Sequence, residues 1–286
     1  MTEKQKNLIT RSITGTLFVA IIVTCFLDAT AMLALFTLAT GMTAYEYCTL
    51  INEHTPYQVN RFITTVASAY FVIAMGGWCT GLTPAVAFVP YLLTIIYLFV
   101  SELYTKAENP ISNLAYTMLS QMYIALPFSM IPVLAFMSSA DGEPRYNYLL
   151  PLSVFIFLWV NDSGAYCFGS MYGKHKLFER VSPKKSWEGS IGGALCVIIA
   201  AVFIALASGE VENNGAVRLL VWIGLGLVVV VFGTLGDLVE SLMKRTLGIK
   251  DSGNILPGHG GMLDRFDSSL MAFPAAVVYL YTLSLL

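Results

Sequence analysis

Charged side chains are scarce in this sequence of 286 residues. Asp, Glu, Lys and Arg make up 12% of it, whereas about 25% is usual in soluble domains. Hydrophobic residues account for 56% of the chain, and the mean hydropathy is +0.70. A soluble fold of this size would have too little polar surface to cover itself. The composition therefore predicts an integral membrane protein.

Paired cysteines and an excess of positive charge are also missing. The five cysteines form no CxxC pair, so neither a disulfide framework nor a zinc site is indicated. A formal net charge of −2 argues against a nucleic-acid partner. HExxH, Walker A, GxGxxG and Ser-His-Asp patterns are absent from the sequence as well. Any catalytic chemistry must therefore come from other residues.

What the chain does contain is a series of long apolar runs. A hydrocarbon core about 30 Å thick requires roughly 20 residues of helix. The fifth run contains Pro127 and Pro132, which predict a kink or a tilt. The first run follows a basic N-terminus with no clear cleavage site, so we expect a span rather than a signal peptide. The predicted spans are 12–28, 30–51, 62–80, 84–103, 112–138, 147–168, 190–208, 216–240 and 268–286.

These runs predict an all-α integral membrane protein with about nine transmembrane helices in one polytopic domain, 1–286. Its N-terminal spans would cover about 12–138 and its catalytic part about 147–286. With a cytoplasmic N-terminus, all but two of the 16 Lys and Arg residues lie on the cytoplasmic side, the exceptions being Arg145 and Arg218. The positive-inside rule favours this orientation. We expect a multi-pass protein of the cytoplasmic (inner) membrane, with its C-terminus on the opposite side and its active site facing the cytoplasm.

Residues 233–269 combine carboxylates, basic residues and glycines. Asp237 and Glu240 share a helix face, and the helix should break near Gly248. An irregular loop rich in backbone N–H groups should follow, which suits a polyphosphate. Mg²⁺ typically binds one or two carboxylates together with substrate phosphates. The alternative is a solvated loop with helix caps and surface ion pairs, although an acid near the end of a span, such as Asp237, is functional by default.

The candidate residues in this segment fall into three chemical groups. The carboxylates are Asp237, Asp251, Asp264 and Asp267, of which Asp264 and Asp267 should lie at the start of the final span. The cations that could neutralise phosphate oxygens are Lys244, Arg245, Lys250 and Arg265. The loop residues are Ser252, Gly258, His259, Gly260 and Gly261.

A second segment, 160–193, lies on the same predicted side. Asp162 is near the end of its span, and Gly164 and nearby glycines permit close helix packing or close ligand approach. Ser182, Lys184, Lys185 and Ser186 suit phosphate binding or, alternatively, a positive-inside anchor beside an interfacial tryptophan. Glu46 is another embedded acid, and pairing with a basic residue or lining the same cavity both remain open.

Both segments resemble one family. SLMKR (241–245), KDSG (250–253), PGHGG (257–261) and DRFD (264–267) are similar to the signature of the phosphatidate cytidylyltransferases, also called CDP-diglyceride synthases. DSGAY (162–166), GKHK (173–176) and SPKKSWEG (182–189) resemble the family's second motif. The resemblance implies an Mg²⁺-dependent, multi-spanning enzyme that converts CTP and phosphatidate into CDP-diacylglycerol and pyrophosphate.

The resemblance also implies roles. Asp237 and Asp264 would be the metal ligands, with K⁺ as a second cation. The chemistry of the two segments adds the remaining expectations. We expect a catalytic set of Asp237, Lys244, Arg245, Asp251, Asp264, Arg265 and Asp267. We expect a substrate-binding set of Asp162, Ser182, Lys184, Lys185, Ser186, Lys250, Ser252, Gly258, His259, Gly260 and Gly261, in which Lys184 and Lys185 are the candidates for the phosphatidate head group.

The sequence also indicates the partners of this protein and leaves two other functions open. The expected partners are CTP, phosphatidate and the lipid bilayer, with a homodimer as an open alternative and no nucleic acid. Two other functions remain to be distinguished. One is a CTP-dependent lipid-alcohol kinase, which would transfer the γ-phosphate. The other, of a different class, is an ion-coupled transporter, although the acids cluster at one membrane face rather than at the midplane.

Overall fold

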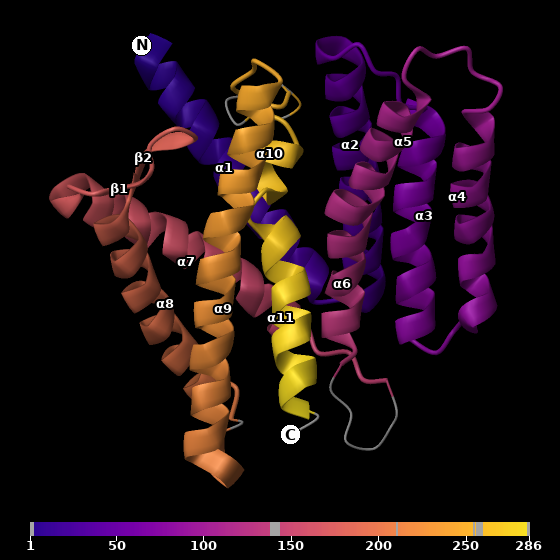
Figure 1. Cartoon of the computed structure of the whole chain (residues 1–286). Coiled ribbons are helices and arrows are strands. Elements are labelled where there is room, and N and C mark those ends of the chain that lie inside the picture. Colours follow the sequence, from indigo (N-terminus) through magenta and orange to yellow (C-terminus); the bar gives the residue numbers. More distant parts are fainter. Residues whose placement is uncertain (1–2, 138–143, 210, 254, 256–259, 285–286) are drawn as a thin grey trace. The chain divides into compact units, whose positions relative to one another are not determined.

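The computed structural model describes residues 3–137, 144–209, 211–253, 255 and 260–284. Helices account for most of these residues (Figure 1), and every predicted span coincides with a helical stretch, so the predicted all-α class is confirmed. In chain order the elements are α1 (Glu3–Phe26), α2 (Ala29–His54), α3 (Arg61–Cys79), η1 (Ala85–Phe88), α4 (Val89–Ser101), α5 (Pro110–Ser120), η2 (Gln121–Ala125), α6 (Leu126–Ala135), α7 (Leu149–Tyr172), β1 (Lys176–Phe178), β2 (Ser182–Ser186), α8 (Trp187–Ala207), α9 (Val211–Thr246), α10 (Leu263–Phe266) and α11 (Ser269–Ser284).

Six helical stretches of the described chain are long and apolar enough to cross a bilayer. Shorter apolar helices cover Ser12–Phe26 and Ala85–Ser101. The chain is therefore a multi-pass membrane protein, while the count of nine spans and their orientation stay predictions. The six stretches are Arg61–Cys79, Pro110–Ala135, Leu149–Tyr172, Trp187–Ala207, Gly215–Thr246 and Leu263–Ser284.

The fifth predicted span is interrupted, as its prolines suggested. A five-residue π-helix, η2, joins α5 to α6 and ends two residues before Pro127. π-Turns of this kind locally break the regular α-helical hydrogen-bond ladder. The amide of Gln121, in this turn, donates to Ser68 Oγ (2.9 Å) and to the carbonyl of Thr64 (3.3 Å) on α3. The irregular turn thereby gains polar attachment to a neighbouring helix.

The chain forms two compact units. Unit 1 comprises Met1–Tyr148 and Thr246–Phe266, and unit 2 comprises Leu149–Arg245 and Asp267–Leu286. The break after Tyr148 falls close to residue 147, where the predicted catalytic part begins. The segment after α9, which carries much of the signature, belongs to unit 1. Each unit is described by itself below.

An aromatic cluster attaches this returning segment to the N-terminal helices of unit 1. The ring of Phe266 in α10 lies 5.0 Å from that of Phe128, 5.6 Å from that of Phe18 and 6.3 Å from that of Phe36. Phe266 is only 2% exposed. Burial of such a side chain stabilises the fold by about 1.5–3 kcal/mol, so α10 is held by packing as well as by hydrogen bonds.

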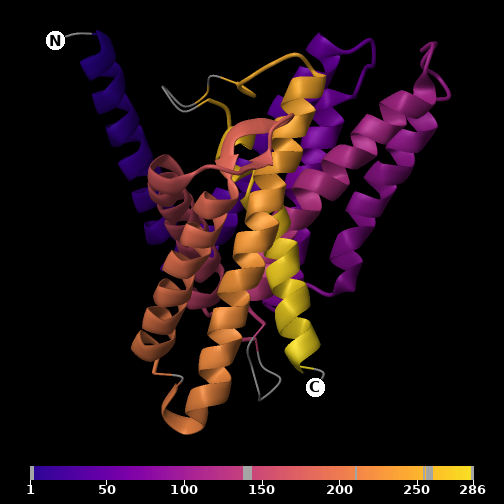
Figure 2. The same cartoon turned by 60° about the vertical axis from the view of Figure 1, so that its left-hand side comes forward.

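In unit 2, α7 and α8 pack closely and are joined by a β-hairpin (Figure 2). A Cβ atom on Gly164 would lie 3.0 Å from the Cα of Gly193, and one on Gly189 would lie 2.8 Å from the carbonyl oxygen of Ala165. Small residues allow two membrane helices to approach this closely. Of the two roles predicted for Gly164, the structure shows helix packing.

The hairpin was not predicted from the sequence. β1 and β2 are antiparallel, with Lys176 opposite Ser186. Glu188 holds the entry to the hairpin, because its carboxylate accepts hydrogen bonds from the backbone N–H groups of Lys174 and His175 (both 3.2 Å). The same carboxylate lies 2.6 Å from Nδ1 of His175. Ser186 then caps α8 by accepting a hydrogen bond from the N–H of Gly189.

Candidate active site

The first candidate region is the loop that follows α9 in unit 1. The helix ends at Thr246, and Gly248 adopts a positive φ of 72°, a conformation that favours glycine. This confirms the predicted break near Gly248. The described part of the loop holds Lys250, Asp251, Ser252, Gly260, Gly261, Asp264 and Arg265, whereas Gly258 and His259 lie outside the described residues.

Glu46 of α2 is the main attachment point of this loop. Its carboxylate accepts hydrogen bonds from Ser252 Oγ (2.5 Å), the N–H of Met262 (2.9 Å) and the N–H of Leu263 (3.0 Å). Glu46 is 6% exposed, and a buried carboxylate requires such donors. The contacts given by the structure answer the question left open by the sequence: Glu46 binds a hydroxyl and backbone groups of the loop.

Asp264, in α10, accepts a second set of hydrogen bonds from the same loop. Its Oδ2 atom accepts hydrogen bonds from the N–H of Ser252 (2.8 Å), the N–H of Gly261 (2.9 Å) and the hydroxyl of Ser252 (2.9 Å). A serine hydroxyl carries one hydrogen. The Ser252 hydroxyl lies within reach of Glu46 as well, so it can donate to only one of the two carboxylates at a time.

The glycines of the loop make room for these carboxylates. A Cβ atom on Gly253 would lie 2.8 Å from Oε2 of Glu46, and one on Gly261 would overlap the same carboxylate. Gly260 has a φ of 77°, and a Cβ there would overlap the carboxylate of Asp264. The sequence predicts a phosphate-binding role for Gly260 and Gly261, which stays a prediction. The structure adds a reason for glycine at both positions.

The second candidate region is a small polar pocket in unit 2. Its volume is about 210 Å³, and its lining includes Asp162, Lys184, Lys185 and Ser186. Beside it, Nζ of Lys185 lies 2.6 Å from Oδ2 of Asp237. Four residues that were selected from the second segment of the sequence (160–193) are thus brought to one pocket, and Lys185 links that pocket to Asp237 of α9.

Further carboxylates gather around this ion pair. Asp267 is close enough to interact electrostatically with Asp237 and with Asp162, and Lys244 contributes an opposing charge. Oδ1 of Asp267 also accepts a hydrogen bond from the N–H of Ser268 (2.6 Å). Three acids and two lysines therefore define an unusually charged region for a membrane-embedded unit.

Two buried residues of unit 2 were not selected from the sequence. Glu240 is fully buried and lies 2.6 Å from Nζ of Lys244, which it orients. Asn161, 4% exposed, lines the polar pocket, and its Oδ1 has no hydrogen-bond partner among the described residues. The sequence places Glu240 on the face of Asp237, whereas nothing in it distinguishes Asn161 from a packing residue.

Several predicted site residues take no part in the hydrogen bonds and ion pairs described above. Arg245, Lys250 and Asp251 are exposed, and Ser182 lies at the start of β2. Asp237 belongs to unit 2 and Asp264 to unit 1, so their joint role as metal ligands stays a prediction. Within the described ranges, no three carboxylate, imidazole or thiolate side chains are grouped closely enough to hold a metal ion.

Comparison with known families agrees with the signature. The family model described as "Cytidylyltransferase family" matches residues 8–283, which is nearly the whole chain. This chain therefore belongs to the cytidylyltransferase family.

Curated relatives carry a more specific name. A protein of Staphylococcus aureus (strain COL) named "Phosphatidate cytidylyltransferase" is 41% identical over 172 residues, which cover 59% of this chain and 60% of the relative. Proteins with the same name from Staphylococcus haemolyticus (strain JCSC1435) and Staphylococcus saprophyticus are 41% and 39% identical over 170 residues, with the same coverage. The chain thus spans about 60% of the length of the relatives it matches.

Proposed function

We propose that this protein is a phosphatidate cytidylyltransferase, which converts CTP and phosphatidate into CDP-diacylglycerol and pyrophosphate. The observation that carries the proposal is the Lys185–Asp237 ion pair beside a polar pocket, in a chain that belongs to a cytidylyltransferase family. The names of the staphylococcal relatives support the choice of phosphatidate as the acceptor.

The reaction requires charge neutralisation more than proton transfer. A phosphate oxygen of phosphatidate attacks the α-phosphorus of CTP, a new P–O bond forms, and the bond to the β-phosphate breaks to release pyrophosphate. A phosphate monoester has a second pKa of about 6 and is already anionic at neutral pH. No strong general base is needed, and cations that hold the two anions together become decisive.

Lys185 is the residue of unit 2 best placed for this task. Its ammonium group neutralises Asp237 at 2.6 Å and borders the pocket that Lys184 also lines. A phosphate that enters this pocket offers Lys185 a stronger, doubly charged acceptor. Lys185 can then pair with the phosphate in place of Asp237. The carboxylate of Asp237 would need another cation to neutralise its charge.

An Mg²⁺ ion is the cation that these residues fit. Asp267 lies close enough to Asp237 and to Asp162 for their charges to interact, and carboxylate oxygens are the ligands this ion prefers. One or two protein carboxylates suffice, because substrate phosphates complete its shell. When bound, the ion would offset the charge of the triphosphate. Asp264 as a further ligand and K⁺ as a second cation rest on the resemblance alone.

The location and assembly belong to the same proposal. CTP would reach the site from the cytoplasm and phosphatidate from the leaflet, in the inner membrane of a bacterial cell. Support comes from the distribution of basic residues along the chain. A homodimer is part of the expectation, and it can be measured by light scattering of the purified protein in detergent.

The test is a transfer assay with position-specific labels. Purified protein in detergent–phosphatidate micelles with Mg²⁺ should move label from the α-phosphorus of CTP into a chloroform-soluble product and release pyrophosphate. Transfer of γ-label alone would replace the proposal with a lipid-alcohol kinase. Folded protein that transfers neither label would contradict both enzymes and favour the transporter.

A further inference from the structure

The polar pocket of unit 2 contains one buried polar side chain whose role the contacts within the described chain do not explain. Asn161, on α7, lines this pocket and is 4% exposed. Its Oδ1 atom has no hydrogen-bond partner among the described residues. A buried polar atom without a partner destabilises a protein, and a membrane-spanning helix has little water to supply one. Asn161 therefore calls for an explanation other than packing.

The side-chain amide of Asn161 has a definite orientation relative to α8. A Cβ atom built on Gly193 would lie 2.5 Å from Oδ1 of Asn161, so this oxygen lies against the backbone of α8. The nitrogen of a planar amide diverges from its oxygen and carries two N–H donors. These donors are therefore the polar groups of Asn161 that are left to face the pocket.

The residues around Asn161 favour an anion in this pocket. Lys184 and Lys185 line it as well, and ammonium groups bind phosphate oxygens through charge-assisted hydrogen bonds. Asp162 also lines the pocket, and the neutral amide beside it adds donors without adding charge. The volume of about 210 Å³ is below the range of about 300–1,000 Å³ that encloses a whole small molecule. It suits one phosphate group.

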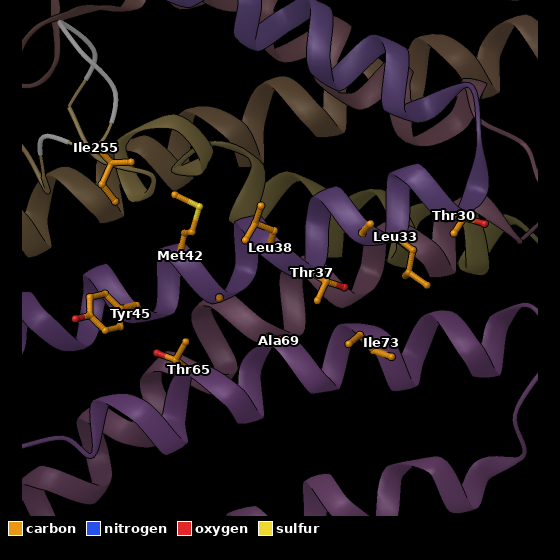
Figure 3. A pocket seen from close by; sticks show the side chains of 12 residues that line it. Thr30, Leu33, Thr37, Leu38, Met42, Tyr45, Thr65, Ala69, Ile73 and Ile255 are labelled. Carbon is orange, nitrogen blue, oxygen red and sulfur yellow. The ribbon is translucent and has the colours of Figure 1, made fainter.

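A larger pocket of unit 1 has the opposite chemistry. It lies along α2 and α3 and has a volume of about 850 Å³ (Figure 3). The described residues that line it are uncharged, so they offer no cation to a phosphate. Volume alone therefore does not identify the place where an anion binds.

Two features of the polar pocket favour a lipid phosphate over a nucleotide phosphate. A phosphate monoester ends in a single phosphate group, whereas a triphosphate would extend beyond a pocket of this size. Tyr166, which lines the pocket, is 77% exposed, and Ile191, which follows the lining residue Ser190 on α8, is 58% exposed. Both helices are long and apolar enough to cross a bilayer. Exposed side chains on them are thus available to the acyl chains of a lipid.

We propose that Asn161 is a further substrate-binding residue, whose side-chain amide donates hydrogen bonds to the phosphate of the lipid substrate beside Lys184 and Lys185. This inference rests on the proposed function, which supplies phosphatidate as the substrate. It also explains the unpaired oxygen, because the orientation that buries Oδ1 against α8 directs the N–H groups toward the pocket. Local losses of stability of this kind are typical of functional sites.

Two substitutions separate the donor of the amide from its acceptor. Asn161→Leu removes both and keeps the size of the side chain, whereas Asn161→Asp keeps the oxygen and removes the N–H donors. In the transfer assay, each should raise KM for phosphatidate at least about tenfold, the scale of one hydrogen bond to a charged group. KM for CTP should stay unchanged. The control is Ser153→Ala, which removes a buried hydroxyl from the same helix and should change neither KM.

Thermal unfolding in detergent distinguishes binding from packing. Since Oδ1 has no partner to lose among the described residues, Asn161→Leu should unfold at the temperature of the wild type or higher. A parallel loss of Tm and affinity would overturn the inference, because Asn161 would then serve the packing of α7 against α8. So would a normal KM for phosphatidate in either variant. A rise in KM for CTP alone would overturn it as well, because the pocket would then hold a nucleotide phosphate.

A binding measurement without turnover lets the inference and the proposed function fail separately. Wild-type protein that transfers no label would contradict the proposed function. In the absence of CTP, dihexanoyl phosphatidate should raise the Tm of the wild type but not that of Asn161→Leu, and inorganic phosphate at the same concentration should have a smaller effect. Equal shifts in the wild type and the variant would overturn the inference. Equal shifts by the lipid and by inorganic phosphate would do so too, because the pocket would then be a site for free phosphate.

Discussion

At the scale of single residues, the hydrogen bonds of Glu46 have the clearest consequence. One buried carboxylate of α2 accepts three hydrogen bonds from a loop more than 200 positions away. Two of the donors are backbone N–H groups, which no substitution within the loop removes except proline. The identity of residue 46 therefore controls the whole attachment.

We expect Glu46→Gln to lower both stability and activity. The glutamine amide group would face backbone donors, and a buried donor left without an acceptor costs about 1–3 kcal/mol. Thermal unfolding in detergent and kcat/KM for CTP would measure the two effects. The matched control is Glu53→Gln on the exposed face of the same helix, which should change stability by less than about 0.5 kcal/mol. Equal behaviour of the two variants would show that the attachment is unimportant.

The sequence identified Glu46 as a notable residue but not its partners. An acid inside an apolar run is conspicuous, and basic residues are the partners one would look for. The actual partners are the Ser252 hydroxyl and main-chain groups of Met262 and Leu263. Backbone donors are present at every residue, so no sequence pattern distinguishes these two.

At the scale of elements, the contact between α7 and α8 depends on glycine. We expect Gly164→Ala to destabilise the protein by about 1–3 kcal/mol, because the new Cβ would lie 3.0 Å from the Cα of Gly193 and overpacking of this kind forces backbone shifts. Gly41→Ala is the control, since its Cβ would meet only an ordinary contact at 3.7 Å. Melting temperatures of the two variants in the same detergent measure the difference. A similar loss for both would contradict the close-packing explanation.

The long apolar runs of the sequence predicted the helices well. The short irregular elements were not predicted from the sequence. Each predicted span contains a helix because length and hydropathy together leave few alternatives in a bilayer. The β1–β2 hairpin escaped prediction, since residues 176–186 are mostly polar and show no clear alternation of polar and apolar positions. The π-helix at Gln121–Ala125 escaped as well, although the prolines after it indicated an irregularity.

At the scale of the whole molecule, the chain passes from one unit to the other after Tyr148, after Arg245 and after Phe266. The sequence suggested an N-terminal part followed by a catalytic part. It did not indicate that residues 246–266 pack with the N-terminal helices, because that assignment depends on contacts of Glu46 and Phe266 across long sequence separations.

This arrangement makes Phe266 important beyond its own helix. We expect Phe266→Ala to lower the stability of the protein by about 3–5 kcal/mol, the usual result of removing a buried phenylalanine. Activity should fall in parallel, since Asp264 lies on the same short helix. Phe99→Ala, in an exposed position on α4, serves as the control. Unfolding curves and transfer rates measured on the same preparations would test both statements. Normal unfolding of Phe266→Ala would contradict the role of the aromatic cluster.

The long separation between Glu46 and its loop also affects biosynthesis. At about 5–20 residues per second, the ribosome needs about 10–40 s after making Glu46 to deliver Ser252, Met262 and Leu263. During that interval α2 has emerged with an acidic side chain whose eventual donors do not yet exist. Other groups must solvate this carboxylate in the nascent helix, so unit 1 reaches its final form only after Leu263 has been made.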